Sequence, residues 1–197
     1  VSPPTPHRHV AFEKMADQPL AAENNADGTP EEPTQSIDGL AFMTAKAPES
    51  FVDGVVGRAA RIDGDYGYLE LADTALIDVA DPLSLGVWVR PEPQPESATK
   101  SARVLAGTAG DKNQLWRGWE FYLDTDERLA LSLISTMPSE KILVKTEEAV
   151  ACDRWTHVGF SYDGSGRASG VRLYVDGRPA TTRVMDDHLP RSIRPVE

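Results

Sequence analysis

The sequence predicts an all-β fold in which two antiparallel sheets pack against each other as a sandwich. Apolar residues alternate at positions 158, 160 and 162 and again at 171, 173 and 175, which is typical of strands with one buried face. Asp176-Gly177 follows the second run and favours a two-residue type I′ turn into a third strand. Similar short runs recur along the chain between Asp, Gly and Pro residues, and none shows a sustained helical period.

The composition limits the classes of protein to which the chain can belong. A length of 197 residues suits one hydrophobic core. The formal net charge of −11 would repel nucleic-acid phosphates, and no apolar run approaches the ~20 residues that span a bilayer. We therefore expect neither nucleic-acid binding nor membrane insertion. Cys152 is the single cysteine, which excludes an internal disulfide and a multi-thiolate zinc site.

The N-terminal part of the chain gives the weaker structural signals. Residues 1–9 are rich in proline and polar groups, so we expect a flexible tail or linker there, followed by one domain over residues 10–197. Strands are predicted at residues 10–13, 40–44 and 68–71 and around Ala60, with a polar surface loop over residues 17–33. Glycines on both sides of the short strand at Ala60 predict turns.

The remaining strand predictions are stronger and cover residues 83–90, 103–106, 118–123, 129–134 and 142–145. In the first of these strands four aliphatic residues share one face, Trp88 lies on the opposite face, and prolines end the strand. Between the two alternating runs, Gly164, Gly166 and Gly170 are expected to supply the positive φ angles of a long hairpin loop.

Several short motifs follow one another in an order that is typical of one family. They are Phe51-Val52-Asp53-Gly54, Ile62-Asp63-Gly64, Trp88-Val89-Arg90-Pro91, Gly118 to Leu123, Trp155-Thr156-His157-Val158, Tyr162-Asp163-Gly164 and Leu173-Tyr174-Val175-Asp176-Gly177. Together they resemble the laminin-G-like module of the concanavalin A-like jelly-roll superfamily, over residues 10–194. The resemblance implies two antiparallel sheets packed face to face, one of them concave, with ligand sites on the concave face or on the rim loops.

A closer resemblance rests on Arg117-Gly118-Trp119-Glu120, on the glycine-rich run that begins at Asp163, and on Asp187-His188-Leu189. These segments are similar to the laminin-G-like insert of planctomycete proteins that also carry a cytochrome-c-like domain. The resemblance implies an extracytoplasmic module, periplasmic or secreted, with flanking domains in the parent chain. The sequence contains no Cys-x-x-Cys-His motif, so we expect no haem attachment on this segment.

The family fold usually ends with further strands that carry an Asp-Glu motif. The sequence reaches Glu197 without such a motif. We therefore expect a jelly roll that lacks its last strands, and a strand near Phe12 that lacks one neighbour.

Glycoside hydrolysis is the enzymatic activity to weigh for this fold, because some proteins with it hydrolyse glucans. Retaining hydrolysis needs two carboxylates about 5 Å apart. The nearest group is Glu120, Asp124 and Asp126, and the first two stand four residues apart, which is roughly 13 Å along a strand. The spacing does not fit, and we predict a protein that is not an enzyme.

The predicted function is a non-catalytic binding module for carbohydrate or protein; the alternatives are a structural spacer without a ligand and a glycoside hydrolase. Carbohydrate sites use exposed aromatic faces flanked by polar groups. Trp116 precedes a strand instead of lying within it, and with Arg117 and Tyr122 it forms the predicted ligand-binding set. Trp88 and Trp155 match family positions that fill or border the core.

A calcium site follows from the resemblance, because laminin-G-like modules often hold Ca²⁺ through carboxylates and loop carbonyls. Glu13, Asp63 and Asp65 are the candidate ligands, and Asp63-Gly64-Asp65 would offer oxygen atoms at a tight turn. The alternative is that this Asp-Gly pair only makes the turn.

Overall fold

The computed structural model describes residues 35–37, 40–46, 50–62, 68–71, 77–94, 100–109 and 115–194. The chain divides into two compact units, of which the smaller covers residues 12–75 and the larger covers residues 76–197 together with residues 1–11. The tail over residues 1–9, the strand near Phe12 and the loop over residues 17–33 lie outside the described residues. These expectations, and the assignment of one domain from residue 10 onward, stay predictions.

Within its described residues, the smaller unit contains two antiparallel sheets. Strands β1 (Gln35–Ile37), β2 (Leu40–Lys46) and β5 (Tyr68–Leu71) form one sheet in the order β1-β2-β5, and β3 (Ser50–Asp53) pairs with β4 (Arg58–Arg61). In the β3–β4 turn Gly57 has a φ of 61°, and the N–H of Gly54 donates to its carbonyl oxygen at 2.9 Å. The strands predicted at 40–44, around Ala60 and at 68–71 are confirmed.

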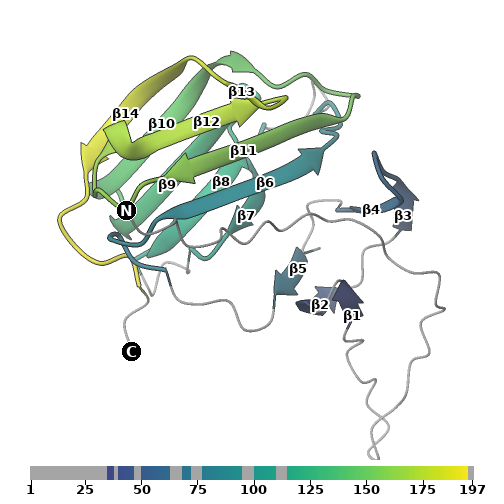
Figure 1. Cartoon of the computed structure of the whole chain (residues 1–197), viewed down its shortest axis with the longest axis horizontal. Coiled ribbons are helices and arrows are strands. Elements are labelled where there is room, and N and C mark those ends of the chain that lie inside the picture. Colours follow the sequence, from purple (N-terminus) through teal and green to yellow (C-terminus); the bar gives the residue numbers. More distant parts are fainter. Residues whose placement is uncertain are drawn as a thin grey trace, which may run out of the picture. The chain divides into compact units, whose positions relative to one another are not determined.

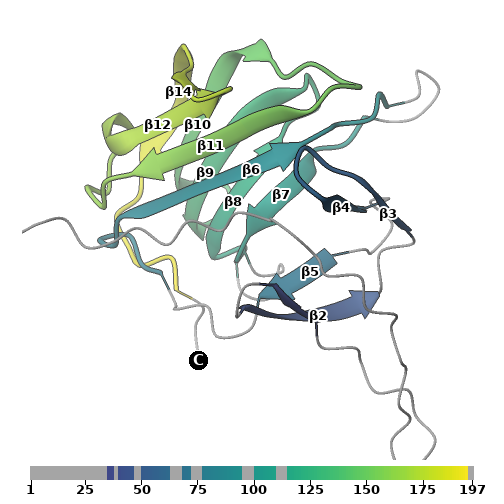
Figure 2. The same cartoon turned by 45° about the vertical axis from the view of Figure 1, so that its right-hand side comes forward.

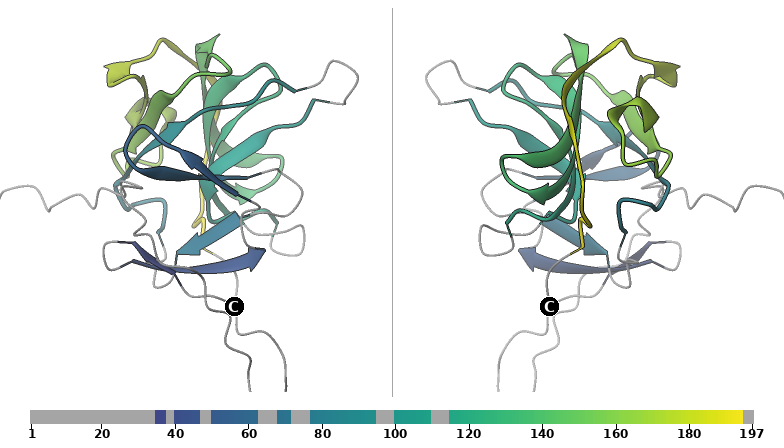
Figure 3. Two further views of the ribbon diagram at one scale, coloured as in Figure 1. Left: turned by 90° about the vertical axis from the view of Figure 1, so that its right-hand side faces the viewer. Right: turned by 90° about the vertical axis from the view of Figure 1, so that its left-hand side faces the viewer.

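The described residues of the larger unit form a sandwich of two antiparallel sheets (Figure 1). The strands are β6 (Leu83–Val89), β7 (Arg103–Gly107), β8 (Gly118–Leu123), β9 (Arg128–Thr136), β10 (Glu140–Ala149), β11 (Thr156–Tyr162), β12 (Val171–Val175), β13 (Arg178–Pro179) and β14 (Thr182–His188). The five-stranded sheet has the order β14-β10-β9-β8-β7, and the four-stranded sheet has the order β13-β12-β11-β6. Figure 2 and Figure 3 show the two sheets as separate layers. The all-β sandwich predicted from the sequence is confirmed.

The core of the larger unit lies between the two sheets, because alternate side chains of both sheets point inward. Phe121 of β8 is 0% exposed and Phe160 of β11 is 2% exposed, and their ring centroids lie 4.9 Å apart. Aliphatic side chains from both sheets pack around them, among them Leu131, Val144 and Leu173. Removal of this apolar surface from water is the main force that holds the two layers together.

Strand β6 presents the two faces that the sequence predicts. Its four aliphatic residues pack against the core; they are Leu83, Leu85, Val87 and Val89. Trp88 is 46% exposed on the outer face, so the expectation that it fills or borders the core is wrong. Trp155 is partly buried, with the guanidinium of Arg90 5.6 Å from its ring centroid. The core tryptophan is Trp119, which is 7% exposed.

The outer face of the four-stranded sheet carries a glycine that a neighbouring ring covers. Gly86 of β6 stands opposite Gly159 of β11, and a Cβ atom at Gly86 would lie 3.0 Å from Nε2 of His157. The His157 ring meets Trp88 edge-on, with ring centroids 5.3 Å apart. The missing side chain at Gly86 therefore leaves room for the imidazole.

Two turns of the four-stranded sheet follow from their sequences. Asp176 and Gly177 have φ values of 48° and 73°, and Val175 stands opposite Arg178, so the predicted two-residue hairpin turn is confirmed. In the β11–β12 loop, Gly164 and Gly166 have φ values of 79° and 68°. Gly170 ends a 3₁₀ turn, η2 (Ala168–Gly170), without a positive φ, which corrects the prediction for this residue. A side chain at Gly170 would collide with the carboxylate of Asp163.

Strand β14 is absent from the sequence prediction. Its residues Thr182–His188 do not alternate between apolar and polar, because β14 lies at the edge of the five-stranded sheet and most of its side chains are exposed. It pairs with β10 from Thr182 opposite Thr146 to His188 opposite Lys141, with an irregularity next to Val144. Pairing with a partner strand, and not burial, places this segment in the sheet.

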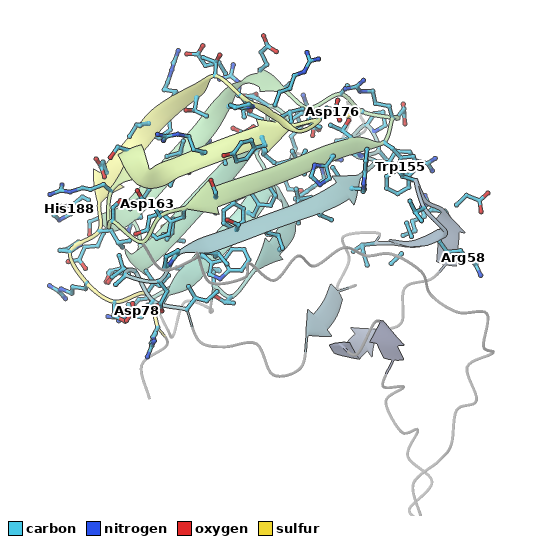
Figure 4. The ribbon with its side chains drawn as sticks, viewed as in Figure 1. Arg58, Asp78, Trp155, Asp163, Asp176 and His188 are labelled. Atoms are coloured by element: carbon cyan, nitrogen blue, oxygen red, sulfur yellow. The ribbon has the colours of Figure 1, made fainter. Side chains whose placement is uncertain are left out.

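Asp78 ties the beginning of the larger unit to its C-terminal segment (Figure 4). One carboxylate oxygen accepts hydrogen bonds from the N–H groups of Val79 at 2.7 Å and Ile193 at 3.0 Å. The other oxygen accepts from the hydroxyl of Ser192 at 2.9 Å, and Arg194 lies within 3.6 Å. Burial raises the pKa of Asp78, but these hydrogen bonds and the charge of Arg194 outweigh it, so the pKa is below its usual value.

Candidate functional site on the five-stranded sheet

The outer face of the five-stranded sheet is built by the alternation of three central strands. Because Trp119, Phe121 and Leu123 of β8 point into the core, Glu120 and Tyr122 point outward. Glu120 stands opposite Ser132 and Tyr122 opposite Ala130 on β9, and these two residues stand opposite Leu143 and Lys145 on β10. We call the six outward residues the outer-face site: Glu120, Tyr122, Ala130, Ser132, Leu143 and Lys145.

Two polar groups of this site are half-buried and lack a partner. Among the described residues, neither the carboxylate of Glu120 nor the hydroxyl of Tyr122 forms a hydrogen bond or an ion pair. Burial raises the pKa of Glu120. Burial first, and then the charges of Glu120 and Asp124, raise the pKa of Tyr122 to about 12, so its hydroxyl keeps its proton at neutral pH and can donate.

Asp124 has a structural task in the β8–β9 turn. One carboxylate oxygen accepts from the N–H groups of Asp126 at 2.9 Å and Arg128 at 3.0 Å, and the other binds the ammonium of Lys145 at 3.0 Å. Burial raises the pKa of Asp124, but these contacts outweigh it and the pKa is lowered. Since Asp124 is held in the turn and Asp126 is exposed on it, Glu120 has no second carboxylate beside it among the described residues.

The structure divides the predicted ligand-binding set between two places. Tyr122 belongs to the outer-face site, whereas Trp116 and Arg117 lie in the turn before β8, and Gly118 is roughly 13 Å from Tyr122 along the strand. The guanidinium of Arg117 donates to the carbonyl oxygen of Ser192 at 3.3 Å, so it is directed toward the C-terminal segment. Arg117 therefore helps to hold the turn.

Trp116 belongs to a second exposed feature at that end of the sandwich. Leu115 and Trp116 have φ values of 57° and 61°, a left-handed conformation that bulky residues rarely adopt. The carbonyl oxygen of Leu115 accepts from the N–H of Met137 at 3.2 Å. The side chains of Leu115, Trp116 and Met137 are 44%, 46% and 41% exposed. We call these three residues the rim patch.

The candidate calcium ligands Glu13, Asp63 and Asp65 lie outside the described residues. Within the part of the chain that the structure describes, no three His, Cys, Asp or Glu residues come together in a group that could hold a metal ion. The calcium site stays a prediction from the sequence.

Sequence reasoning missed the relation between Glu120 and its neighbours. The spacing of the acidic residues suggests Glu120 only as a member of a catalytic pair, and nothing in the sequence joins Ser132 and Lys145 to it. The signal that unites them is the strand register, which aligns β8, β9 and β10 so that their outward residues share one face. Alternation within each strand gives the face, but the register is set by contacts between strands.

The two-layer antiparallel architecture of the larger unit is that of a jelly-roll sandwich. A family model described as the concanavalin A-like lectin/glucanases superfamily, of the laminin G class, matches residues 63–194. Because this match covers more than half of the chain, the protein belongs to that superfamily, and the laminin-G-like resemblance is confirmed. The comparison with curated proteins found no match. No helix among the described residues is long and apolar enough to span a membrane.

Proposed function

We propose that the chain is a non-catalytic module that binds carbohydrate at the outer-face site. The observation that carries this proposal is the pair Glu120 and Tyr122, two half-buried polar groups on one sheet face without an intramolecular partner among the described residues. Partial burial reduces the hydration of such a group, at a cost below the ~1–3 kcal/mol of a fully buried, unpaired group. Hydroxyl groups of a bound ligand would offset that cost.

The chemistry of the site suits a sugar. Tyr122 offers an aromatic ring for the apolar C–H groups of a pyranose and a hydroxyl that donates, while the carboxylate of Glu120 accepts. Ala130 and Ser132 of β9 are 0% and 4% exposed, so a ligand would contact the longer side chains on either side of them, those of Glu120, Tyr122, Leu143 and Lys145.

A catalytic role has less support from the same face. Retaining glycoside hydrolysis needs a second carboxylate about 5 Å from the first. Asp124 lies four residues from Glu120 and binds Lys145 and two backbone N–H groups of the turn. A carboxylate with a lowered pKa and three partners is a poor general acid.

Protein recognition is a second candidate, favoured by the rim patch. Three large apolar side chains share one end of the sandwich, and Leu115 and Trp116 are held in a strained backbone conformation. Exposed clusters of this kind mark interaction sites in soluble proteins. The third alternative is a structural spacer that binds nothing.

The test is a glycan array with neutral, acidic and basic oligosaccharides, followed by titration calorimetry on the best binder. We expect Tyr122→Ala to weaken binding at least tenfold, which corresponds to about 1.4 kcal/mol. Tyr122→Phe keeps the aromatic ring and should lose less affinity than Tyr122→Ala. Val184→Ala, a change of a residue that is 52% exposed on β14, is the matched control and should bind like the wild type.

An array without binders, or a Tyr122→Ala variant with unchanged affinity, would refute the carbohydrate proposal. A pull-down that recovers a protein with the wild type and not with Trp116→Ala would then favour recognition through the rim patch. Absence of both kinds of binding would leave the spacer function.

The setting of the module is proposed on the resemblance alone. We place it outside the cytoplasm, in a longer planctomycete-type protein with a cytochrome-c-like domain, where flanking domains are its further partners. The calcium site at Glu13, Asp63 and Asp65 belongs to the same proposal. A melting temperature that does not change on addition of calcium or EDTA would contradict it.

A further inference from the structure

The cations nearest the outer-face site are already neutralised by carboxylates. The ammonium of Lys145 lies 3.0 Å from Asp124, and the ammonium of Lys141 lies 3.4 Å from Asp186. Both pairs are partly buried, with the lysine side chains 24% and 14% exposed. These two cations therefore offer little uncompensated positive charge to a ligand.

Glu120 has no such partner in the part of the chain that the structure describes. Its neighbours across the strands are Gly107 on β7 and Ser132 on β9, and its neighbours along the same face of β8 are Gly118 and Tyr122. All four residues are uncharged, and a carboxylate loses solvation when it is half-buried among them.

Among the described residues of this face, Arg128 at the far end of β9 is a cation without an ion-pair partner. It stands four positions from Ser132, which lies opposite Glu120, and this spacing is roughly 13 Å along the strand. It is too far from Glu120 to compensate the carboxylate directly. As far as the described residues go, the outer-face site therefore keeps one uncompensated negative charge beside the ring of Tyr122.

From this charge distribution we infer that the sugar unit bound beside Glu120 is an amino sugar with a free ammonium group. The inference rests on the proposed function and specifies its ligand class. An ammonium at this position would donate to the carboxylate and act as the cation that the described residues do not supply. A neutral sugar would supply hydroxyl donors only, and a uronate would place a second carboxylate against Glu120.

The size of the preference follows from the partial exposure of the site. Ion pairs at such positions contribute up to about 1 kcal/mol, which is about fivefold in affinity. We therefore expect the amino sugar to bind about fivefold more tightly than its neutral counterpart and the uronate to bind more weakly than both. Because the interaction is electrostatic, the preference should decrease as salt is added.

The test compares three β-1,4-linked tetramers by calorimetry: glucosamine, N-acetylglucosamine and glucuronate. The first two differ only in the acetyl group that removes the charge. The measurement is repeated from neutral to mildly acidic pH, because the sugar amine must carry its proton and burial raises the pKa of Glu120, whose charge the ion pair also requires. Glu120→Gln should abolish the preference for glucosamine. Asp126→Asn, the control, removes an exposed carboxylate of the β8–β9 turn and should retain the preference for glucosamine.

The outcomes separate the two proposals. A preference for glucosamine that Glu120→Gln removes and Asp126→Asn retains supports the inference. Equal binding of the three tetramers, a preference for glucuronate, or a preference that persists in Glu120→Gln overturns the inference while carbohydrate binding stands. If neither these tetramers nor any sugar on the array binds, the proposed function fails and the inference fails with it.

Discussion

Substitution of Asp78 by asparagine should destabilise the larger unit at neutral pH. The carboxylate of Asp78 accepts hydrogen bonds from Val79, Ser192 and Ile193 and lies within 3.6 Å of Arg194. An asparagine has one acceptor oxygen and an amide group that can only donate, so it cannot serve all three donors. The C-terminal segment would lose part of its attachment.

The magnitude follows from the number and kind of bonds. A hydrogen bond to a charged group contributes about 1.5–3 kcal/mol, and a buried donor left unpaired costs about 1–3 kcal/mol. Asparagine retains one acceptor, and the Asp78 side chain is 26% exposed, so water can replace part of the loss. We expect the free energy of unfolding to decrease by about 2 kcal/mol.

The effect should depend on pH in one direction. The pKa of Asp78 is lowered in the folded protein, so its contribution to stability is present above the unfolded pKa, near 3.8, and is lost as pH falls through the folded pKa. The asparagine variant has no carboxyl group to titrate. The difference in stability between wild type and variant should therefore shrink as pH falls below about 4.

Urea denaturation followed by tryptophan fluorescence is a suitable assay, because all four tryptophans lie in the larger unit. Asp126→Asn, on an exposed part of the β8–β9 turn, is the matched control and should match the wild type. Two results would show that Asp78 does not hold the C-terminal segment. One is an Asp78→Asn variant whose free energy of unfolding falls by well below ~1 kcal/mol at neutral pH, and the other is a difference from the wild type that stays constant as pH falls below about 4.

Three further predictions concern stability measured by the same denaturation. Glu120→Gln should raise the free energy of unfolding at neutral pH by about 0.5–1 kcal/mol, because burial raises the pKa of Glu120 and disfavours its charged form; an unchanged or lower value would contradict this. Gly177→Ala should lower the free energy of unfolding by about 1 kcal/mol, because the glycine has a positive φ. Gly164→Ala should lower it further, because Gly164 also has a positive φ and a Cβ atom there would lie 2.5 Å from a carbonyl oxygen. Equal losses would refute that distinction. Phe121→Ala should cost about 3–5 kcal/mol through the cavity it leaves, and a loss under 1 kcal/mol would mean that the core is not where the structure places it.

The contrast between Glu120 and Asp78 indicates which carboxylate is available to a ligand. Both lie on one chain with a strong excess of acidic residues, but the pKa of Asp78 is lowered by its partners and the pKa of Glu120 is raised by burial alone. The charge of Asp78 therefore stabilises the folded state, and the charge of Glu120 destabilises it. A charge that costs stability and has no partner is a common property of binding sites.

Much of the larger unit could be predicted from local sequence patterns. Alternation places Val158 and Phe160 in the core, and the Asp176-Gly177 pair identifies a hairpin turn. Strand β14 could not be found in this way, because an edge strand with exposed side chains has no alternating burial to display. The family position of Trp88 predicts a core residue, whereas the alternation of its own strand puts it on the face opposite four core residues, where the structure has it.

The candidate site was only partly predictable for a related reason. The sequence identifies Tyr122 as an aromatic residue on a strand, but it does not show that the partner of Asp124 is Lys145, 21 residues further along. That pairing depends on the registers of β8, β9 and β10 together. Once Asp124 is seen to belong to its turn, Glu120 is left as a half-buried carboxylate without a partner among the described residues.

The attachment of Asp78 to Ile193 also has a topological consequence. The backbone enters the larger unit and leaves its final turn at one place, since a single carboxylate oxygen bonds to Val79 and Ile193. Units whose ends adjoin tolerate circular permutation, because a short linker can join the old ends while the chain is reopened elsewhere. The exposed turn at Asp176-Gly177, where a side chain at Gly177 would meet nothing within 4 Å, is a suitable place for the new ends. The module could then be displayed in the opposite direction on a scaffold without disturbing the outer-face site.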